Sequence, residues 1–347
     1  MAPKILLLGA TGYIGGDALF ALTQTHPDYE ITCLVRNSDK GAQVASQYSR
    51  ATLVYGDLDD TELLEQEAKK VDIVLNCANS DHEVAIKALL TGLRAREAGQ
   101  RVFLIHTSGN LLLSFPDIDR KTFGEASTKI YDDWEGISEI TSVPAHAPHR
   151  SADKIIIEAD APDLKTAIVV PPTIYGQGRG PSNQRSHQVP DMAKFTLERK
   201  GGFQVGAGRN AMPNVHVYDL SDCYMRIVEA AVQGGGRMTW GKEGYYFTEN
   251  GEHVWGHVAK AITVAAHKQG LIPSDEVQTV DEEAADEMIP RGAVLWGANS
   301  RYRALRARKL LDWSPKEKGL DYYIPEAVSS EAKSIGLVPG HAAKVAG

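Results

Sequence analysis

Three glycines near the start of the chain have the spacing of a phosphate-binding turn. Gly9, Gly12 and Gly15 recur at every third position in the segment KILLLGATGYIGG, residues 4–16. A turn built from glycine lets a phosphate approach the backbone closely, and the N-terminus of a following helix favours negative charge. The segment therefore predicts a dinucleotide site, with a tight turn without a ligand as the alternative. The residues expected to contact the cofactor here are Gly9, Thr11, Gly12, Tyr13, Ile14 and Gly15.

The residue after the second apolar run bears on which dinucleotide binds. The run EITCLV, residues 30–35, is followed directly by Arg36. In dinucleotide-binding folds this position faces the adenosine ribose, where an acid binds a free 2′-hydroxyl and an arginine accommodates a 2′-phosphate. Arg36 therefore favours NADP over NAD. Asp39 nearby weakens this preference, and a solvated surface arginine is the alternative.

Two further strand ends are expected to line the cofactor. The run at 52–55 leads into GDLDD, where Asp57 would accept from the adenine amino group and Leu58 would pack on the ring. Asp57 also suits a loop or a helix cap that needs no ligand. The run at 71–79 ends in Ala78 and Asn79, which are small or polar where the cofactor ribose would pass.

The elements that must position these residues alternate along the chain. The aliphatic run at 5–8 suits a buried parallel strand, and the periodic segment at 13–22 suits a helix. Further strands are expected at 30–35, 52–55, 71–79 and 101–110, with an amphipathic helix at 81–98. Because no hairpin signal interrupts this order, the first half predicts an α/β fold with a doubly wound parallel sheet.

Composition narrows the class of protein. The 347 residues are 43% hydrophobic and 24% charged, which is ordinary for a soluble globular chain. A net charge of −8 with both signs scattered argues against nucleic acid or an anionic membrane as a partner. We expect a cytoplasmic protein, since no run suits a membrane span and the N-terminus enters a strand at once. Cys33, Cys77 and Cys223 have neither zinc nor redox spacing, so buried thiols and no metal site are expected.

Several segments together resemble the extended or atypical branch of the short-chain dehydrogenase/reductase superfamily. They are GATGYIGG at 9–16, GDLDD at 56–60, HTSG at 106–109, PPTIYGQGRG at 171–180, VGAGRNAMPNVHVYDLSD at 205–222 and ARKLLDWSPK at 307–316. The resemblance implies a Rossmann sheet with a smaller carboxy-terminal substrate lobe, and it places Pro171 and Ile174 beside the nicotinamide. The implied Rossmann core covers 1–175 and is completed by about 205–235. The lobe covers 176–204 and 236–336, and a flexible tail covers 337–347.

The proton relay of that superfamily is incomplete in this chain. Its members place a tyrosine and a lysine four residues later on one helix face, where the lysine lowers the tyrosine pKa, and a serine after the fifth strand positions the substrate. Ser108 and Thr107 match the serine region, with Thr107 expected to contact the cofactor, and Lys154 matches the lysine. The family lysine also binds the nicotinamide ribose, so Lys154 is expected to bind the cofactor as well. Arg150 stands where the tyrosine is expected, in a pattern, HRSADK, that resembles a fungal-type epimerase/dehydratase-like subgroup.

Three side chains are candidates for the missing acid. His149 has an intrinsic pKa of about 6.5 and can exchange a proton itself, although one helical step turns it about 100° from the tyrosine position. Tyr131 lies in an apparent insertion that can fold over the site, and Tyr175 should lie near the cofactor, with packing as its alternative. A fourth possibility has no side-chain relay, with Arg150 binding an anionic substrate group or a cofactor phosphate.

The second half is expected to handle the substrate. Residues 177–189 have the glycine-rich, polar composition of a mobile loop and would lie over the substrate pocket. His216 and Asp219 fall in a segment that fixes the lobe to the sheet in the family, so a structural role is expected for both. Arg301 and Arg303 would bind a sugar diphosphate or pair with the acidic run at 281–287.

Three functions are compatible with the sequence. The first is an NADP-dependent oxidoreductase that transfers a hydride to or from a small carbonyl or alcohol substrate. The second is a nucleotide-sugar epimerase/dehydratase-like enzyme, and the third is a non-catalytic dinucleotide-sensing regulator that resembles NmrA-like proteins. The missing tyrosine favours the regulator, whereas the lobe segments argue against it. The expected partner is a small molecule, and a homodimer would pair through the helices near 81–98 and 151–159.

Overall fold

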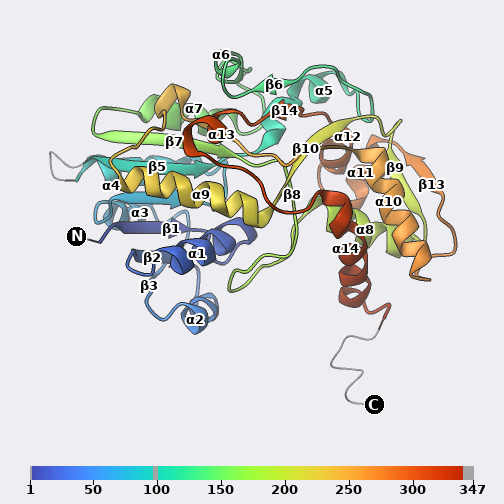
Figure 1. Ribbon diagram of the computed structural model, residues 1–347, viewed down its shortest axis with the longest axis horizontal. Helices are drawn as coiled ribbons and strands as arrows, with labels where there is room; N and C mark the ends of the chain where they lie inside the picture. The colour runs from blue at the N-terminus through green and yellow to red at the C-terminus, as the bar shows by residue number, and fades with distance from the viewer. Residues whose placement is uncertain (1, 97–100, 339–347) are drawn as a thin grey trace.

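The computed structural model describes residues 2–96 and 101–338. Its centre is a parallel sheet with the strand order β11-β7-β5-β4-β1-β2-β3 (Figure 1). The strands are β1 (Lys4–Leu8), β2 (Glu30–Val35), β3 (Thr52–Tyr55), β4 (Ile73–Asn76), β5 (Val102–Thr107), β7 (Leu164–Val170) and β11 (Tyr245–Phe247). The doubly wound α/β fold expected from the sequence is confirmed.

Helices cover both faces of this sheet. On one face, α1 (Tyr13–Thr25) packs against α9 (Val217–Val232). On the other, α4 (Glu83–Arg94) packs between α3 (Thr61–Ala68) and α7 (Arg150–Ala159) (Figure 1). Every residue of β4 and β5 is buried, as expected for parallel strands covered on both sides. Within residues 2–96 and 101–338, no helix combines the length and the apolar character needed to cross a membrane.

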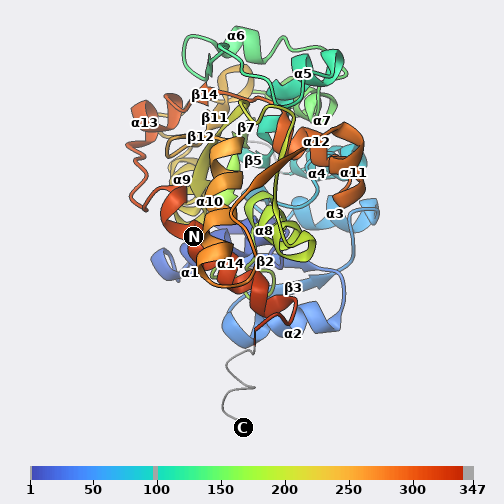
Figure 2. The same cartoon turned by 90° about the vertical axis from the view of Figure 1, so that its right-hand side faces the viewer.

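A second group of elements forms a lobe beside the sheet. It contains α8 (Gln188–Arg199), α10 (Trp255–Lys268), α12 (Gly292–Gly297), α14 (Leu320–Ser334) and the parallel pair β9 (Gly202–Val205) and β13 (Val277–Val280). Helices α8, α10 and α14 pack on one another around their own apolar core (Figures 1 and 2). Trp255 and Trp296 are each 1% exposed within that core. The lobe therefore has a packing centre distinct from that of the sheet.

Short elements connect the two parts. A small sheet orders β8 (Thr173–Tyr175) beside β10 (Ala211–His216), which pairs in turn with β12 (Glu252–Val254). The other elements of the described chain are α2 (Ser38–Gln47), η1 (Asn110–Ser114), α5 (Phe115–Arg120), β6 (Tyr131–Asp132), α6 (Ile137–Ile140), η2 (Gly241–Glu243), α11 (Glu282–Met288), β14 (Tyr302–Arg303) and α13 (Arg306–Leu311).

Some boundaries differ from the sequence expectation. Strand β11 falls within the range assigned to the lobe, yet its aromatic residues are buried beside β7 in the central sheet. Burial of aromatic residues stabilises the folded state in either core, so the local sequence pattern does not reveal which core they join. Strand β10 ends at His216, whose Nδ1 accepts from the Tyr218 N–H at 3.2 Å and caps α9. Of the expected tail, residues 339–347 lie outside the described residues.

The turn after β1 depends on a close backbone approach. Leu8 lies beside Asn76 in register, so the carboxyl ends of β1 and β4 meet. Gly9 follows with a φ of 87°, a left-handed conformation that favours glycine. A Cβ at Gly9 would lie 2.4 Å from the Cys77 carbonyl oxygen, and a Cβ at Gly15 would lie 2.4 Å from the Gly9 carbonyl oxygen. At Gly9 and Gly15, two of the three predicted positions, any residue other than glycine would clash with the neighbouring backbone.

We expect Gly9→Ala to lower the free energy of unfolding by about 1–3 kcal/mol, because the new Cβ adds both backbone strain and a clash. Equilibrium urea denaturation measures this change. Gly201→Ala is the matched control, since no atom lies within 4 Å of its added Cβ and its φ is not positive. The control should stay within about 0.5 kcal/mol of the parent. Equal stability of both variants would contradict the tight turn.

Candidate functional site

The N-terminus of α1 is open to an anion. The first-turn N–H groups of an α-helix have no acceptor inside the helix. At α2 the side chain of Asn37 accepts the Lys40 N–H at 3.0 Å, and at α3 Asp60 accepts the Leu63 N–H at 3.3 Å. Helix α1 instead begins after Gly12, which has no side chain to cap it. Its N–H groups and dipole are therefore available to a phosphate.

A pocket of about 370 Å³, here called the inner pocket, adjoins this helix end. Its walls come from the start of α1, the end of β4, the segment around β8 and the chain before α8. The lining side chains used below are Tyr13, Ile14, Cys77, Pro172, Ile174 and Arg185. Three residues predicted to contact a cofactor, Tyr13, Ile14 and Ile174, thus lie together. The predicted Pro171 is buried, and its neighbour Pro172 lines the pocket instead.

Residues 176–187, here called the crossing loop, are attached to α1 through a buried ion pair. Asp17 is fully buried, and its carboxylate accepts from the Arg179 backbone and guanidinium at 2.5 to 3.1 Å. Ser221 of α9 donates to the same carboxylate at 2.6 Å. The Arg179 guanidinium also lies over the ring of Tyr218 at 3.8 Å. The sequence predicted a mobile loop because no local pattern indicates the ion pair between Asp17 and Arg179.

The far end of the crossing loop reaches over the glycine turn to α2. The Asn183 N–H donates to the Thr11 carbonyl at 3.2 Å, and Lys40 Nζ donates to Ser182 Oγ at 2.8 Å. The loop thus passes over the glycine turn at which the sequence predicts a dinucleotide, and Thr11 contacts the loop through its backbone.

Arg36 is available for a ligand at the end of β2. Its side chain is exposed and has no hydrogen bond or ion pair within the part of the chain that the structure describes. Asn37 beside it is committed to capping α2, whereas Lys40 adds a second cation one helical turn away. The predicted 2′-phosphate position is therefore flanked by two positive side chains.

The other predicted adenosine contacts already take part in local turns. Asp57 is exposed, and its Oδ1 accepts from the Asp59 N–H at 2.9 Å. Asn79 accepts from the Asp81 N–H at 3.1 Å. Leu58 and Ala78 are half-buried at these strand ends. Their roles in cofactor binding stay predictions.

The hydroxyl groups at the end of β5 point into the protein. Thr107 Oγ1 lies 2.6 Å from the Tyr224 hydroxyl. Ser108 Oγ donates to Asp153 Oδ2 at 2.9 Å, and the Tyr245 hydroxyl donates to the same oxygen at 2.5 Å. Burial raises the pKa of Asp153 to about 6, against the opposing effect of these hydrogen bonds. The serine expected to position a substrate is thus engaged in a buried network.

Helix α7 presents Asp153, not Lys154, to the interior. The Lys154 side chain is 60% exposed, and its Nζ lies 3.7 Å from Glu158 Oε1. Successive helical residues point about 100° apart, so burying Asp153 against Ser108 turns Lys154 to solvent. Lys154 is therefore not among the residues that line the inner pocket, and its expected roles in cofactor binding and catalysis stay predictions.

Three other predicted residues make structural contacts. Arg150 Nη2 donates to the Thr141 carbonyl at 2.7 Å, and its Nη1 is buried without a partner in the described chain. Tyr131 is 7% exposed in β6, which pairs with β14, and it does not line the inner pocket. Tyr175 is 2% exposed, and its hydroxyl donates to the Lys318 carbonyl at 2.7 Å. Tyr175 therefore has the packing role that the sequence left as an alternative.

His149 and Asp81 form a hydrogen-bonded pair at the carboxyl end of the sheet. His149 Nδ1 lies 2.8 Å from Asp81 Oδ1 and 3.3 Å from Ser80 Oγ. The hydrogen bond from His149 is the main cause that lowers the pKa of Asp81. His149 Nε2 lies against Gly109, where an added Cβ would be 2.7 Å from it. Because Nδ1 is held by the carboxylate, Nε2 is the ring nitrogen left for proton exchange, although His149 is not among the residues that line the inner pocket.

The backbone explains why sequence reasoning misjudged the direction of His149. It has a φ of 65° and lies just before α7, so the helical angle between it and position 150 does not apply. A left-handed conformation at a non-glycine residue costs free energy and recurs at functional sites. Sequence reasoning missed Asp81, although its place shortly after β4 is a usable signal, since carboxyl ends of neighbouring parallel strands meet at one edge.

Asp219 has the structural role expected from the sequence. Its carboxylate accepts from the Lys316 N–H at 2.7 Å and the Glu317 N–H at 3.2 Å, which attaches the segment before α14 to α9. Arg301 pairs with Glu252 at 2.9 Å and not with the acidic run at 281–287. The arginine is therefore used within the protein and is not free for a diphosphate.

Comparisons with known proteins agree with this architecture. The profile of the NAD dependent epimerase/dehydratase family matches residues 5–240. The oxidase ucsJ of Acremonium sp is 38% identical over 347 residues, which covers 97% of this chain and 100% of that protein.

Two solved structures share the fold over nearly their whole length. The dTDP-glucose 4,6-dehydratase (rfbB) of Bacillus anthracis, in complex with NAD, is 18% identical with a TM-score of 0.66, covering 96% of this chain and 97% of that one. DesIV, the dTDP-glucose 4,6-dehydratase of Streptomyces venezuelae with NAD and TYD bound, is 16% identical with a TM-score of 0.66 and coverages of 97% and 99%. At these low identities the similarity shows a shared fold and nothing further about function.

We expect Asp153 to make stability fall as the pH rises from 4 to 7. The carboxyl group ionises near its ordinary pKa of 3.8 in the unfolded chain and at about 6 in the folded one, so the folded state holds a proton that the unfolded state has lost. A shift of about two pKa units corresponds to roughly 3 kcal/mol. Asp153→Asn removes this dependence. The free energy of unfolding of the variant, minus that of the parent, should therefore increase by about 2–3 kcal/mol across this range in urea denaturation.

Asp163→Asn is the control, because Asp163 is exposed and its side chain has no hydrogen bond in the described chain. Its difference from the parent should not vary with pH. A pH-independent difference for Asp153→Asn would contradict the raised pKa.

Proposed function

The chain belongs to the NAD dependent epimerase/dehydratase family, and we propose that it is an NADP-binding oxidoreductase that transfers a hydride to or from a small carbonyl or alcohol substrate. One observation carries the proposal: the uncapped N-terminus of α1 at the glycine turn borders the inner pocket, and Arg36, which has no partner among the described residues, lies at the end of the neighbouring strand. The 38% identity to an oxidase supports a redox reaction.

The residues around the turn fit a bound dinucleotide. Gly9 and Gly12 have no side chains to cover the backbone, so the first-turn N–H groups of α1 would bind the diphosphate. Arg36 and Lys40 would flank a 2′-phosphate. Ile174 would pack against the nicotinamide end from the wall of the inner pocket. When bound, the nicotinamide supplies or accepts the hydride.

His149 is proposed to move the proton that accompanies the hydride. When a carbonyl carbon gains a hydride, its oxygen must gain a proton, and the imidazole Nε2 would donate it. Asp81 would hold the ring through Nδ1 and stabilise its charged form. The pair would thereby replace the tyrosine for which Arg150 stands in this chain.

Two other functions are each favoured by one observation. A nucleotide-sugar epimerase or dehydratase is favoured by the fold shared with the two dehydratases, and NAD that stays bound through purification would support it. A dinucleotide-sensing regulator is favoured by the engagement of Ser108 and Lys154 away from the inner pocket. Tight NADPH binding without any absorbance change across a broad panel of carbonyls and alcohols would support the regulator.

The partner proposed for the site is a small molecule. A homodimer is proposed to form through α4 and α7, which pack side by side on one face of the sheet. Sedimentation equilibrium of the full chain would test this assembly.

We expect Arg36→Ala to weaken NADPH binding about 10- to 100-fold and to leave NADH binding nearly unchanged. The reason is the loss of a charge-assisted hydrogen bond to the 2′-phosphate, worth about 1.5–3 kcal/mol. Titration calorimetry with both cofactors measures the effect. Arg50→Ala is the matched control, since Arg50 is an exposed, unpaired arginine of the described chain that precedes the amino end of β3. Equal affinities of the parent protein for NADPH and NADH would remove the argument for Arg36.

We expect His149→Asn to reduce NADPH-dependent turnover of any reactive carbonyl by about 100-fold or more, since a positioned acid contributes about that much. NADPH affinity should stay unchanged, and Asp81→Asn should shift the pH profile of turnover. His146→Asn provides the control, because His146 makes a similar contact with Asp119, at 2.9 Å, in an exposed position. Unchanged turnover in His149→Asn would exclude it as the acid.

A further inference from the structure

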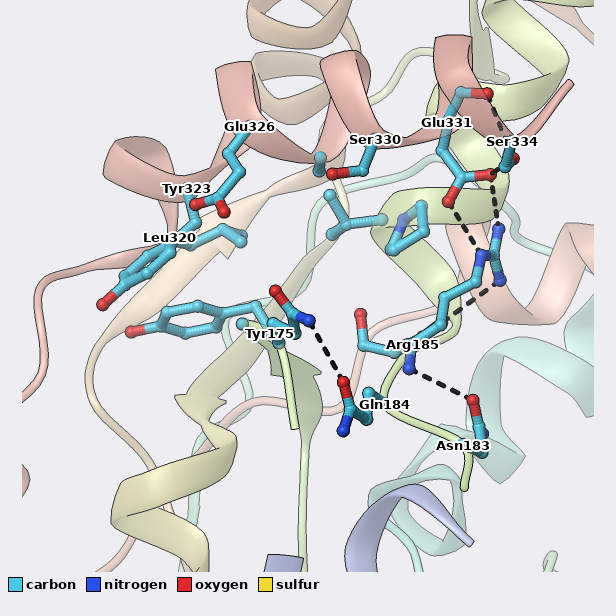
Figure 3. Close-up of a pocket in the computed structure, with 16 residues that line it drawn as sticks. Tyr175, Asn183, Gln184, Arg185, Leu320, Tyr323, Glu326, Ser330, Glu331 and Ser334 are labelled. Atoms are coloured by element: carbon cyan, nitrogen blue, oxygen red, sulfur yellow. Dashed lines mark hydrogen bonds and ion pairs between the residues drawn. The ribbon is translucent and has the colours of Figure 1, made fainter. Parts of the chain in front are cut away.

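A second pocket, here called the outer pocket, lies between the crossing loop and α14 (Figure 3). Its volume is about 370 Å³, within the range of small-molecule sites. Asn183, Arg185 and Ser186 of the loop line both pockets and form a wall that the two share. The start of α1 and Cys77, which follows β4, line only the inner pocket, whereas α14 and the start of α8 line most of the outer one. The outer pocket is therefore a separate space from the predicted dinucleotide site.

The floor of the outer pocket is apolar and well buried. Tyr175 and Val189 are each 2% exposed and Leu320 is 4% exposed. Tyr323 packs against Tyr175, with ring centroids 5.4 Å apart at an interplanar angle of 48°. Figure 3 shows these two rings at one end of the pocket and Arg185 at the other. Such a floor favours a ligand with a flat apolar ring.

The charges of the outer pocket disfavour an anion. Arg185 is the only Lys or Arg that lines it among the described residues, and its guanidinium donates to both oxygens of Glu331 at 2.8 and 3.1 Å. The same guanidinium lies 2.7 Å from Asp191. Glu326 also lines the pocket, is exposed, and has no hydrogen bond or ion pair in the described chain. A ligand would thus meet one neutralised cation and one unpaired carboxylate.

We propose that the outer pocket binds a small molecule with an apolar ring and no negative charge, at the same time as a dinucleotide occupies the inner pocket. The proposal goes beyond the proposed hydride transfer and does not depend on it. A phosphate or carboxylate would be repelled by Glu326 and would find no free cation among the described lining residues, whereas a basic nitrogen near Glu326 would be stabilised. The ligand class therefore differs from the nucleotide sugars of the two structural neighbours.

Three probes that share one ring and differ in charge test the proposal: indole, tryptamine and indole-3-acetate. Binding to the full chain is measured by titration calorimetry in the presence of saturating NADPH. We expect indole and tryptamine to bind and indole-3-acetate to bind at least 10-fold more weakly than tryptamine. Equal affinities of tryptamine and indole-3-acetate, displacement of the probes by NADPH, or no binding of any probe would overturn the proposal.

Two substitutions on α14 test whether the probes bind in this pocket. Ser330 is exposed and lines the pocket, so Ser330→Trp should fill it and weaken indole binding at least 10-fold. Lys333→Trp is the control, because Lys333 is exposed on the same helix and does not line the pocket. Glu326→Lys should reverse the preference, so that indole-3-acetate binds more tightly than tryptamine. Indole affinity unchanged in Ser330→Trp, or an unaltered charge preference in Glu326→Lys, would overturn the proposal.

These measurements need no turnover. Failure of the outer pocket to bind the probes would leave hydride transfer untouched, and a lack of turnover would leave the probe titrations interpretable.

Discussion

The close approach of two backbone segments at the ends of β1 and β4 is the constraint on which the site depends. Any side chain at Gly9 would meet the Cys77 carbonyl, and any at Gly15 would meet Gly9 itself. Because β1 also pairs in parallel with β2, this approach brings the start of α1, Arg36 and the residues after β4 to one edge of the sheet. Phosphate binding, ribose selection and proton transfer are thereby proposed for neighbouring positions, although they come from separate stretches of chain.

A buried charge then determines the position of the crossing loop. An unpaired carboxylate at Asp17 would cost several kcal/mol, and the bonds from Arg179 and Ser221 offset that desolvation. Since Arg179 is 162 residues away along the chain, the ion pair holds a distant loop against the glycine turn. The same loop separates the inner pocket from the outer one, so one ion pair shapes both spaces.

A second buried carboxylate determines how α7 faces the sheet. Asp153 accepts from Ser108 and Tyr245, and this network occupies the interior position next to β5. Lys154 is turned to solvent as a result. Ser108 is engaged by Asp153 and Lys154 lines neither pocket, so the roles that the resemblance implies for both stay predictions, whereas His149 and Asp81 meet at the edge of the same sheet.

Local pattern was sufficient for strands β1 to β5 of the central sheet and for the glycine turn. The apolar runs of β1 to β5 and the spacing of Gly9, Gly12 and Gly15 depend on neighbours in the chain, and so does the position of Arg36 directly after a strand. The sequence therefore determined the fold class, and it indicated the place where a dinucleotide is proposed to bind. Only the tertiary structure decided that β11 joins the central sheet, that Lys154 faces solvent, and that Asp17 binds Arg179. The contact between His149 and Asp81, which are 68 residues apart, was likewise decided only by the tertiary structure. Each of these outcomes depends on which side chain best fills or neutralises a buried space formed by distant segments, and no pattern among adjacent residues encodes that choice.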